Sequence, residues 1–253
     1  MKVTILQRDI EWSNPAVNQQ RASEAIDRNP GSDLYVLPEM FSTGFCTNPE
    51  GVAEPLAEDG ECVTLRWMKR KAAQIDAAVA GSVAVEEQGH YFNRFYFVKP
   101  DGEVAFYDKM HLFTYGGEHH RFTAGSERRV VEFRGVRILL EICYDLRFPV
   151  WSRNRGDYDM ILYVASWPSS RVAAWSALLV ARAIENQCYV AGVNRVGNDP
   201  ACEYNGGSAI INPYGERIAS CVIGEECEVS ATIDMEALEA FRCKFPVLND
   251  RDI

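Results

Sequence analysis

Short hydrophobic runs, separated by turn-forming residues, occur along the whole chain. Their β-branched and aromatic composition is typical of strands, and they lie at residues 2–6, 34–37, 79–85, 91–98, 104–107, 130–133, 137–143, 160–164, 188–196, 208–212, 217–221 and 227–233. Two of these segments, 138–142 and 160–164, are hydrophobic at consecutive positions, which is typical of strands covered on both faces. The pattern therefore predicts sheets that are buried between other layers.

The hydrophobic spacing of helices occurs in three segments: residues 22–26 after an Asn14-Pro15 start, residues 68–79, and residues 173–186. Pro-Asp-Gly at 100–102 and Pro-Tyr-Gly at 213–215 each separate two predicted strands, which indicates hairpin turns. We therefore predict the α/β class, with antiparallel pairs mixed into layered sheets and helices outside. Because no repeat, low-complexity tract or linker divides the chain, residues 1–253 are expected to form one domain.

Acidic residues outnumber basic ones by 36 to 26, which gives the 253-residue chain a net charge of −10. This excess of negative charge disfavours nucleic acid and anionic membrane surfaces as partners. The longest hydrophobic stretch, residues 172–184, contains Arg182 and is shorter than the ~18 apolar residues that a transmembrane helix needs. Residues 1–12 lack the apolar core of a secretory signal, so we expect a cytoplasmic protein.

The eight cysteines contain no C-x-x-C pair and the four histidines no H-x-x-x-H pair, so a structural zinc site is not expected. In a reducing compartment most of these thiols are expected to be small core residues. At most one or two of them need a chemical explanation.

Cys143 is the cysteine with the most suggestive surroundings. It ends an apolar predicted strand and is followed at once by the polar residues Asp145 and Arg147. The loops that follow strands are where a rigid sheet presents side chains to a ligand, although a buried, inert thiol is the ordinary alternative. We expect Arg147 to pair with Asp145 or with a helix end.

Glu39 also follows a short apolar strand, directly after Pro38. It has hydrophobic neighbours, Leu37, Met40 and Phe41, which would partly desolvate its carboxylate and raise its pKa toward the range of a general base. A solvated loop carboxylate is the alternative.

Lys109 lies in the segment FYDKMHLF, among aromatic and aliphatic residues. Its ammonium could stabilise an oxyanion, or its stem could simply lie along an apolar surface. Together, Cys143, Glu39 and Lys109 supply a nucleophile, a proton acceptor and a fixed cation, which is what acyl transfer through a thiol requires.

At this point the sequence resembles the nitrilase superfamily of carbon-nitrogen hydrolases, in which Glu, Lys and Cys follow one another in this order. The resemblance extends over nearly the whole chain, through LPEMFSTGF, YDKMHLF, GGEHHRFTAG, ICYDLRFP, ASWP, ARAIENQCYVAGVNRVG and INPYGE. It implies a four-layer αββα sandwich and a homodimer. The segments MHLF, GGEHHRFTAG, SWPSSR and FPVLNDRD are most similar to the omega-amidase branch, which includes 2-oxoglutaramate amidases.

The resemblance implies that Cys143 is the nucleophile, Glu39 the general base and Lys109 the stabiliser of a tetrahedral intermediate. Glu118 matches the second glutamate of the family, which orients the lysine and the substrate amide. The backbone N–H of Tyr144 would complete an oxyanion hole with Lys109. The implied reaction converts a terminal amide to a carboxylate and ammonia through a cysteine thioester, and it requires no metal or organic cofactor.

An omega-amidase substrate, a 2-oxo acid with a terminal amide, also needs a site for its carboxylate. Arg171 is the candidate, since a guanidinium offers two parallel hydrogen bonds to a carboxylate. Aromatic walls are expected from Phe41, Tyr115 and Trp167, although each could instead be core packing.

Other classes fit less well. A papain-like enzyme needs a histidine after its cysteine, yet all four histidines precede Cys143. Neither the G-x-S-x-G of α/β-hydrolases nor the G-x-G-x-x-G of dinucleotide-binding enzymes is present. The alternatives that stay open are another amide or N-carbamoyl hydrolase of the same superfamily, and a catalytically silent binding protein with the same fold.

Overall fold

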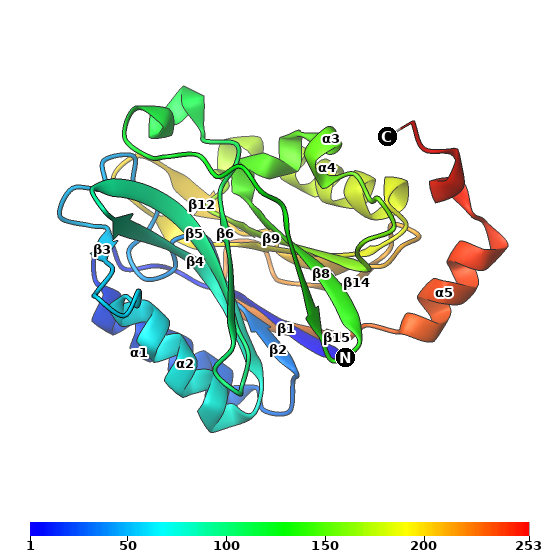
Figure 1. Ribbon diagram of the computed structural model, residues 1–253, viewed down its shortest axis with the longest axis horizontal. Helices are drawn as coiled ribbons and strands as arrows, with labels where there is room; N and C mark the ends of the chain where they lie inside the picture. Colours follow the sequence, from blue (N-terminus) through cyan, green and yellow to red (C-terminus); the bar gives the residue numbers. More distant parts are fainter. Residues whose placement is uncertain (253) are drawn as a thin grey trace.

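Two β-sheets pack face to face and carry helices on their outer faces (Figure 1). This arrangement is seen in the computed structural model, which describes residues 1–252. It confirms the α/β class and the expected αββα order of layers. The hydrophobic residues between the sheets form one continuous core, which includes Val3 and Ile5 from one sheet and Ile138 and Leu140 from the other.

The first sheet has the strand order β15-β1-β2-β4-β5-β6, and β3 pairs with β4. β1, β2 and β4 are parallel to one another, whereas β15, β5 and β6 join through antiparallel pairs. Its strands are β1 (Lys2–Gln7), β2 (Leu34–Val36), β3 (Glu54–Pro55), β4 (Ala78–Glu87), β5 (His90–Val98), β6 (Val104–Asp108) and β15 (Cys227–Thr232).

The second sheet has the order β14-β13-β10-β9-β8-β7, in which β8, β9 and β10 are parallel. Its strands are β7 (Arg129–Phe133), β8 (Val136–Ile142), β9 (Met160–Ala165), β10 (Tyr189–Asn194), β13 (Ala209–Ile211) and β14 (Arg217–Ser220). A separate hairpin joins β11 (Val196–Asn198) to β12 (Glu203–Asn205). The two predicted hairpin turns are confirmed, because β5 pairs antiparallel with β6, and β13 with β14.

Helices α1 (Pro15–Arg28) and α2 (Val63–Ile75) cover the first sheet, and α4 (Val172–Glu185) covers the second (Figure 1). The Asn14 side chain caps α1 and Pro15 occupies its first turn, as the sequence predicts. The segment 68–79 was predicted to be helical throughout, but α2 ends at Ile75. Asp76 then adopts a left-handed conformation, φ 49°, and the chain enters β4.

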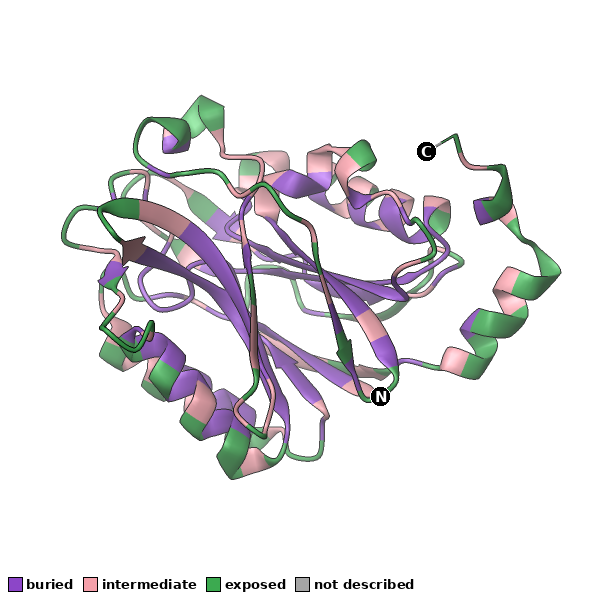
Figure 2. Ribbon diagram, in the orientation of Figure 1, coloured by how far each residue is buried: buried purple, intermediate pink, exposed green. Residues whose placement is uncertain are grey.

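Two helices, α3 (Pro149–Ser152) and α5 (Met235–Lys244), were not predicted. α5 projects away from the body of the protein near the C-terminus, and most of its surface is exposed (Figures 1 and 2). Leu238 is its only buried residue, so its sequence carries little hydrophobic periodicity. Within residues 1–252, no helix is both long enough and apolar enough to cross a membrane.

Candidate active site

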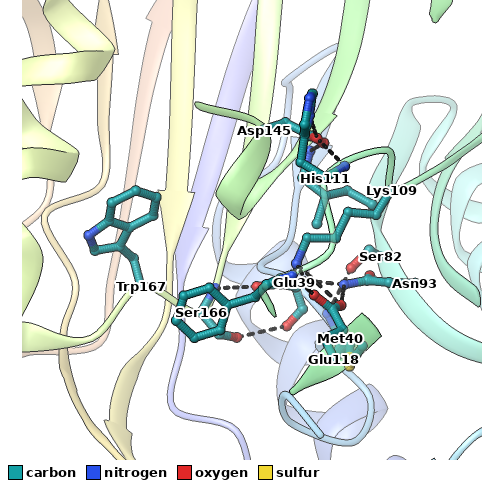
Figure 3. Close-up of polar contacts among 12 residues, drawn as sticks. Glu39, Met40, Ser82, Asn93, Lys109, His111, Glu118, Asp145, Ser166 and Trp167 are labelled. Atoms are coloured by element: carbon teal, nitrogen blue, oxygen red, sulfur yellow. Dashed lines mark hydrogen bonds and ion pairs between the residues drawn. The ribbon is translucent and has the colours of Figure 1, made fainter. Parts of the chain in front are cut away.

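The side chains of Glu39, Lys109 and Glu118 meet in one cluster that is closed to solvent (Figure 3). Nζ of Lys109 lies 2.9 Å from Oε1 of Glu39 and 3.0 Å from Oε2 of Glu118. Cys143 lies beside them and is the member of the group that is partly exposed. The structure thus brings together four residues that are far apart in the sequence.

Glu39, Lys109 and Cys143 meet because they follow strands that end at the same edge of the sandwich. Glu39 follows β2 and Lys109 follows β6, while Cys143 follows β8 of the facing sheet. β2 and β4 are parallel, and two antiparallel pairings lead from β4 to β6, so β2 and β6 run in the same direction. Side chains that follow the carboxyl ends of such strands are the usual source of ligand-binding groups.

The segment that carries Glu39 lies unusually close to β4. Gly81 makes this possible, because a Cβ at that position would lie 2.9 Å from Cδ1 of Phe41 and 3.0 Å from Cβ of Leu37. Ser82 then fixes the turn that follows Glu39, since its Oγ accepts a hydrogen bond from the backbone N–H of Met40 at 2.9 Å (Figure 3). Met40 itself has a φ of 44°, which turns the chain directly after Glu39.

Cys143 occupies the junction between β8 and the 3₁₀ helix η3 (Cys143–Arg147). Its φ of 47° lies in the left-handed region, where a residue other than glycine, Asn or Asp is uncommon. Such backbone conformations cost of order 1–3 kcal/mol and cluster at functional sites. The sharp turn directs the thiol into the cavity at the end of the sheets.

Two residues that the sequence did not single out complete the cluster. The Asn93 side-chain amide donates to Oε1 of Glu39 at 2.8 Å and to Oε1 of Glu118 at 3.3 Å. The backbone N–H of Ser166 donates to the other Glu39 oxygen, Oε2, at 2.8 Å. Every oxygen of the Glu39 carboxylate therefore has a fixed partner, which sets its orientation toward the thiol. The sequence held no signal for Asn93, which lies mid-strand in β5 with no catalytic motif around it.

A cavity of about 50 Å³ opens beside Cys143, and Glu39 and Lys109 also contribute to its lining. Its walls come from loops of both sheets and include the predicted residues Tyr144, Trp167 and Arg171, together with Phe45, Phe113, Arg147, Ser166, Pro168, Cys202 and Tyr204. Since a single water needs only ~10–15 Å³, this space holds a few small atoms, enough for the reacting end of a small molecule.

Two of the residues expected to wall the site do not do so. Phe41 is buried in the core between the first sheet and its helices, where its ring lies 5.7 Å from that of Trp67. Tyr115 is 86% exposed and lies outside the cavity, in contact with Phe113. The expectation was wrong because both residues neighbour true site residues in the sequence, and their side chains point elsewhere.

The expected pairing of Arg147 with Asp145 is also wrong. Asp145 is buried and bound by other donors, including the backbone N–H and the ring Nδ1 of His111, while the Arg147 guanidinium lies 4.8 Å from the centre of the Trp167 ring. The guanidinium of Arg171 lies against the rings of Phe113 and Tyr115. Among the residues that the structure describes, neither arginine forms a salt bridge.

Burial controls the charges of the cluster. It raises the pKa of the Cys143 thiol well above its ordinary value, and the nearby Glu39 raises that pKa further, against the opposing effect of Lys109. Burial alone would lower the pKa of Lys109, but the carboxylates of Glu118 and Glu39 raise it above its ordinary value. Burial also raises the pKa of Glu118, although Lys109 lowers it. The resting site therefore holds an ammonium and a protonated thiol.

This arrangement can perform nucleophilic chemistry on a carbonyl. A thiol that stays protonated at rest needs a base that takes its proton as it attacks, and the Glu39 carboxylate lies where it can do so. A permanently charged ammonium can stabilise the negative charge that then develops on the carbonyl oxygen.

Known proteins are similar to this chain in both sequence and fold. The sequence pattern of the carbon-nitrogen hydrolases matches residues 2–243. The chain is 48% identical to omega-amidase YafV of Escherichia coli K12, over all of this chain and 97% of that protein. It is 38% identical to 2-oxoglutaramate amidase of Bacillus subtilis, over 99% of this chain and 98% of that protein.

A solved structure is also close. XC1258 of Xanthomonas campestris, described as a CN-hydrolase superfamily protein with an arsenic adduct in its active site, has a TM-score of 0.95 and 42% identity. That comparison covers 100% of this chain and 97% of XC1258. Since the family pattern and the relatives both extend over nearly the full length, the chain belongs to the carbon-nitrogen hydrolase family.

Proposed function

We propose that the protein is an omega-amidase, which hydrolyses the terminal amide of a 2-oxo dicarboxylic acid such as 2-oxoglutaramate, or of succinamate, to a carboxylate and ammonia. The observation that carries this proposal is the Lys109 ammonium, held between the buried carboxylates of Glu39 and Glu118 beside the thiol of Cys143. The omega-amidase and 2-oxoglutaramate amidase relatives support the choice of substrate. The whole chain is proposed to act as one catalytic domain.

The first half of the reaction forms a thioester. The Cys143 sulfur attacks the amide carbon while Glu39 takes the thiol proton, so that no free thiolate accumulates in a site that disfavours it. Lys109 and the backbone N–H of Tyr144 hold the oxyanion of the tetrahedral intermediate. Glu39 then gives its proton to the departing nitrogen, the C–N bond breaks, and ammonia leaves.

The second half returns the enzyme to its starting state. A water molecule loses a proton to Glu39 as it attacks the thioester carbon, and Lys109 again faces the oxyanion. The C–S bond then breaks, the Cys143 sulfur regains the proton from Glu39, and the carboxylic acid product leaves and loses its proton to solvent to become the carboxylate. Glu118 orients Lys109 throughout, since its Oε2 is itself fixed by the backbone N–H of Phe113 at 2.6 Å.

Arg171 is proposed to bind the carboxylate at the far end of the substrate. It lies on the cavity wall, its guanidinium rests on aromatic rings, and no acidic residue of the described chain neutralises it. Trp167 is held firmly in the same wall, because its indole N–H donates to the backbone carbonyl of Arg171 at 2.8 Å. Arg147 adds a second positive charge to this wall.

Replacing Arg171 with methionine should therefore weaken binding of acidic substrates selectively. A hydrogen bond to a charged group is worth ~1.5–3 kcal/mol, so we expect KM for succinamate to rise about 10-fold or more. KM for butyramide, which lacks the carboxylate, should be unchanged. Steady-state ammonia release from both amides measures the difference.

Arg134→Met is the matched control, because Arg134 also lies against an aromatic ring, that of Phe133, but does not line the cavity. Equal losses for succinamate and butyramide in Arg171→Met would remove Arg171 from the proposal. If the wild-type protein preferred N-carbamoyl amino acids or nitriles to both amides and to 2-oxoglutaramate, the omega-amidase assignment itself would be wrong.

We also propose that the protein is a cytoplasmic homodimer. All eight cysteines are free, which is typical of a reducing compartment. An apolar groove lies between α4, the β13–β14 turn and α5, where Ile184, Tyr214 and Phe245 are 51–60% exposed. A second copy of the chain would cover these side chains.

The wild-type protein is accordingly expected to have twice the mass of the 28.5 kDa chain in solution. Phe245→Glu should shift it toward the monomer, because a charge in a buried interface is costly. Light scattering after size-exclusion chromatography measures both masses. Val63→Glu is the control, since Val63 is 66% exposed on α2, on the other outer face. A monomeric wild type would contradict the proposal.

A further inference from the structure

Asp145 lies two residues after Cys143 and has no place in the reaction described above. Its side chain is fully buried and does not line the cavity, so it cannot touch a substrate. Its carboxylate nevertheless accepts four hydrogen bonds, of 2.8–3.0 Å, which come from two different segments of the chain. A buried carboxylate with that many fixed partners holds those partners in place.

One oxygen of Asp145 fixes the turn at the nucleophile. Oδ2 accepts from the backbone N–H of Ile142 at 2.9 Å, which closes a loop across Cys143. Cys143 is the residue in this loop with the unfavourable positive φ, and such a conformation persists only where surrounding contacts enforce it. The Asp145 carboxylate is the contact that spans it.

The same carboxylate holds the segment that carries Lys109. Oδ1 accepts from the backbone N–H of His111 at 3.0 Å and lies 2.8 Å from its Nδ1 (Figure 3). Oδ2 also accepts from the hydroxyl of Tyr107 at 2.9 Å. Tyr107 and His111 are the residues two places before and two places after Lys109, so Asp145 forms hydrogen bonds to this segment on both sides of Lys109.

The donors are themselves immobilised. The Tyr107 hydroxyl accepts from the backbone N–H of Met110 at 3.0 Å and from the indole of Trp151 at 3.2 Å. The His111 ring stacks on Phe148 with a centroid distance of 3.8 Å and an angle of 7°. Phe148 follows η3 directly, so this stacking joins the Lys109 segment to the Cys143 turn a second time.

We propose that Asp145 is a positioning residue. It joins the turn that carries Cys143 to the segment that carries Lys109, and it thereby sets the distance between the Cys143 sulfur and the Lys109 ammonium. The inference rests on the proposed roles of Cys143 and Lys109. A displacement of about 1 Å between reacting groups can cost ~10²-fold in rate. The contribution of Asp145 should therefore be seen in catalysis as well as in stability.

Asp145→Asn tests this with almost no change in size. Each carboxylate oxygen accepts from one backbone N–H, so the single oxygen of an asparagine leaves either Ile142 or His111 facing an NH₂ group. We expect kcat for succinamate to fall about 100-fold with KM little changed. We also expect alkylation of Cys143 by iodoacetamide, followed by peptide mass spectrometry, to slow markedly.

Asp159→Asn is the matched control. Asp159 is also buried and accepts four hydrogen bonds, from Arg137 and Arg242, but it lies at the opposite end of β9 from the site. The Asp159→Asn variant should lose thermal stability, while its kcat and its rate of Cys143 alkylation stay near the wild-type values. Equal kinetic behaviour of the two variants would overturn the proposal.

Tyr107→Phe provides a milder test should Asp145→Asn not fold. It removes one of the four hydrogen bonds and keeps the ring, so kcat and the alkylation rate should fall in the same direction by a smaller factor. Wild-type values for both would overturn the proposal. The alkylation rate needs no amide substrate, so a wild type that hydrolysed no omega-amide would refute the proposed function while leaving this test intact.

Discussion

Cys143→Ala is expected to abolish ammonia release from 2-oxoglutaramate and succinamate. Covalent catalysis divides the reaction into two steps through the thioester, and without the sulfur neither step exists. The other members of the site would remain in place, because Cys143 forms none of the contacts that hold Lys109 between Glu39 and Glu118. The variant should therefore fold and bind substrate, and a discontinuous ammonia assay should find no turnover above background.

Cys202→Ala is the control for this result. Cys202 lines the same cavity, so this substitution removes a second thiol of the cavity wall and leaves Glu39, Lys109 and Glu118 unchanged. It should retain kcat near the wild-type value. If Cys143→Ala kept a substantial part of the activity, or if Cys202→Ala lost it instead, the assignment of the nucleophile would be wrong.

Lys109→Met is expected to have the second largest effect, and to affect both rate and stability. Loss of one oxyanion-stabilising group typically costs ~10²–10³ in kcat. Removing one partner of a buried ion pair typically costs ~3–5 kcal/mol, since an uncompensated charge stays behind, and here two carboxylates would face each other. Steady-state kinetics and thermal unfolding should show a decrease in kcat together with a lower Tm.

Lys71→Met separates the two effects. Lys71 is also buried and pairs with Asp27 at 2.6 Å, but it lies on α2, away from the cavity. It should lower the Tm and leave kcat unchanged. A Lys109→Met enzyme with wild-type kcat would exclude the ammonium from the transition state, whatever its stability.

The layers of the fold could be predicted from local patterns. Consecutive hydrophobic positions in residues 138–142 and 160–164 identify strands buried on both faces, and both segments lie between the inter-sheet core and the outer helix layer. The end of α2 could not be predicted, because Val79 continues the helical spacing by coincidence and belongs to β4. α5 was missed for the opposite reason, since an exposed helix needs no hydrophobic face.

In the site, too, some residues could be predicted from the sequence and others could not. Glu39 and Cys143 could be identified because each follows an apolar strand, and Lys109 because its neighbours in the sequence are aromatic and aliphatic. The family resemblance added Glu118. Asn93 could not be found, since only the pairing of β5 with β4 and β6 brings its amide to Glu39. Phe41 was misplaced because its backbone position gives no indication of side-chain direction, and the turn at Met40 sends it into the core.

Direct detection of the covalent intermediate tests the central claim. The protein would be mixed with excess 2-oxoglutaramate, quenched in acid within the first turnovers, digested and examined by mass spectrometry. The account predicts an acyl adduct on the peptide that contains Cys143, removable by hydroxylamine and absent from Cys143→Ala. Ammonia release at full rate with no adduct, or with the adduct on another residue, would contradict it.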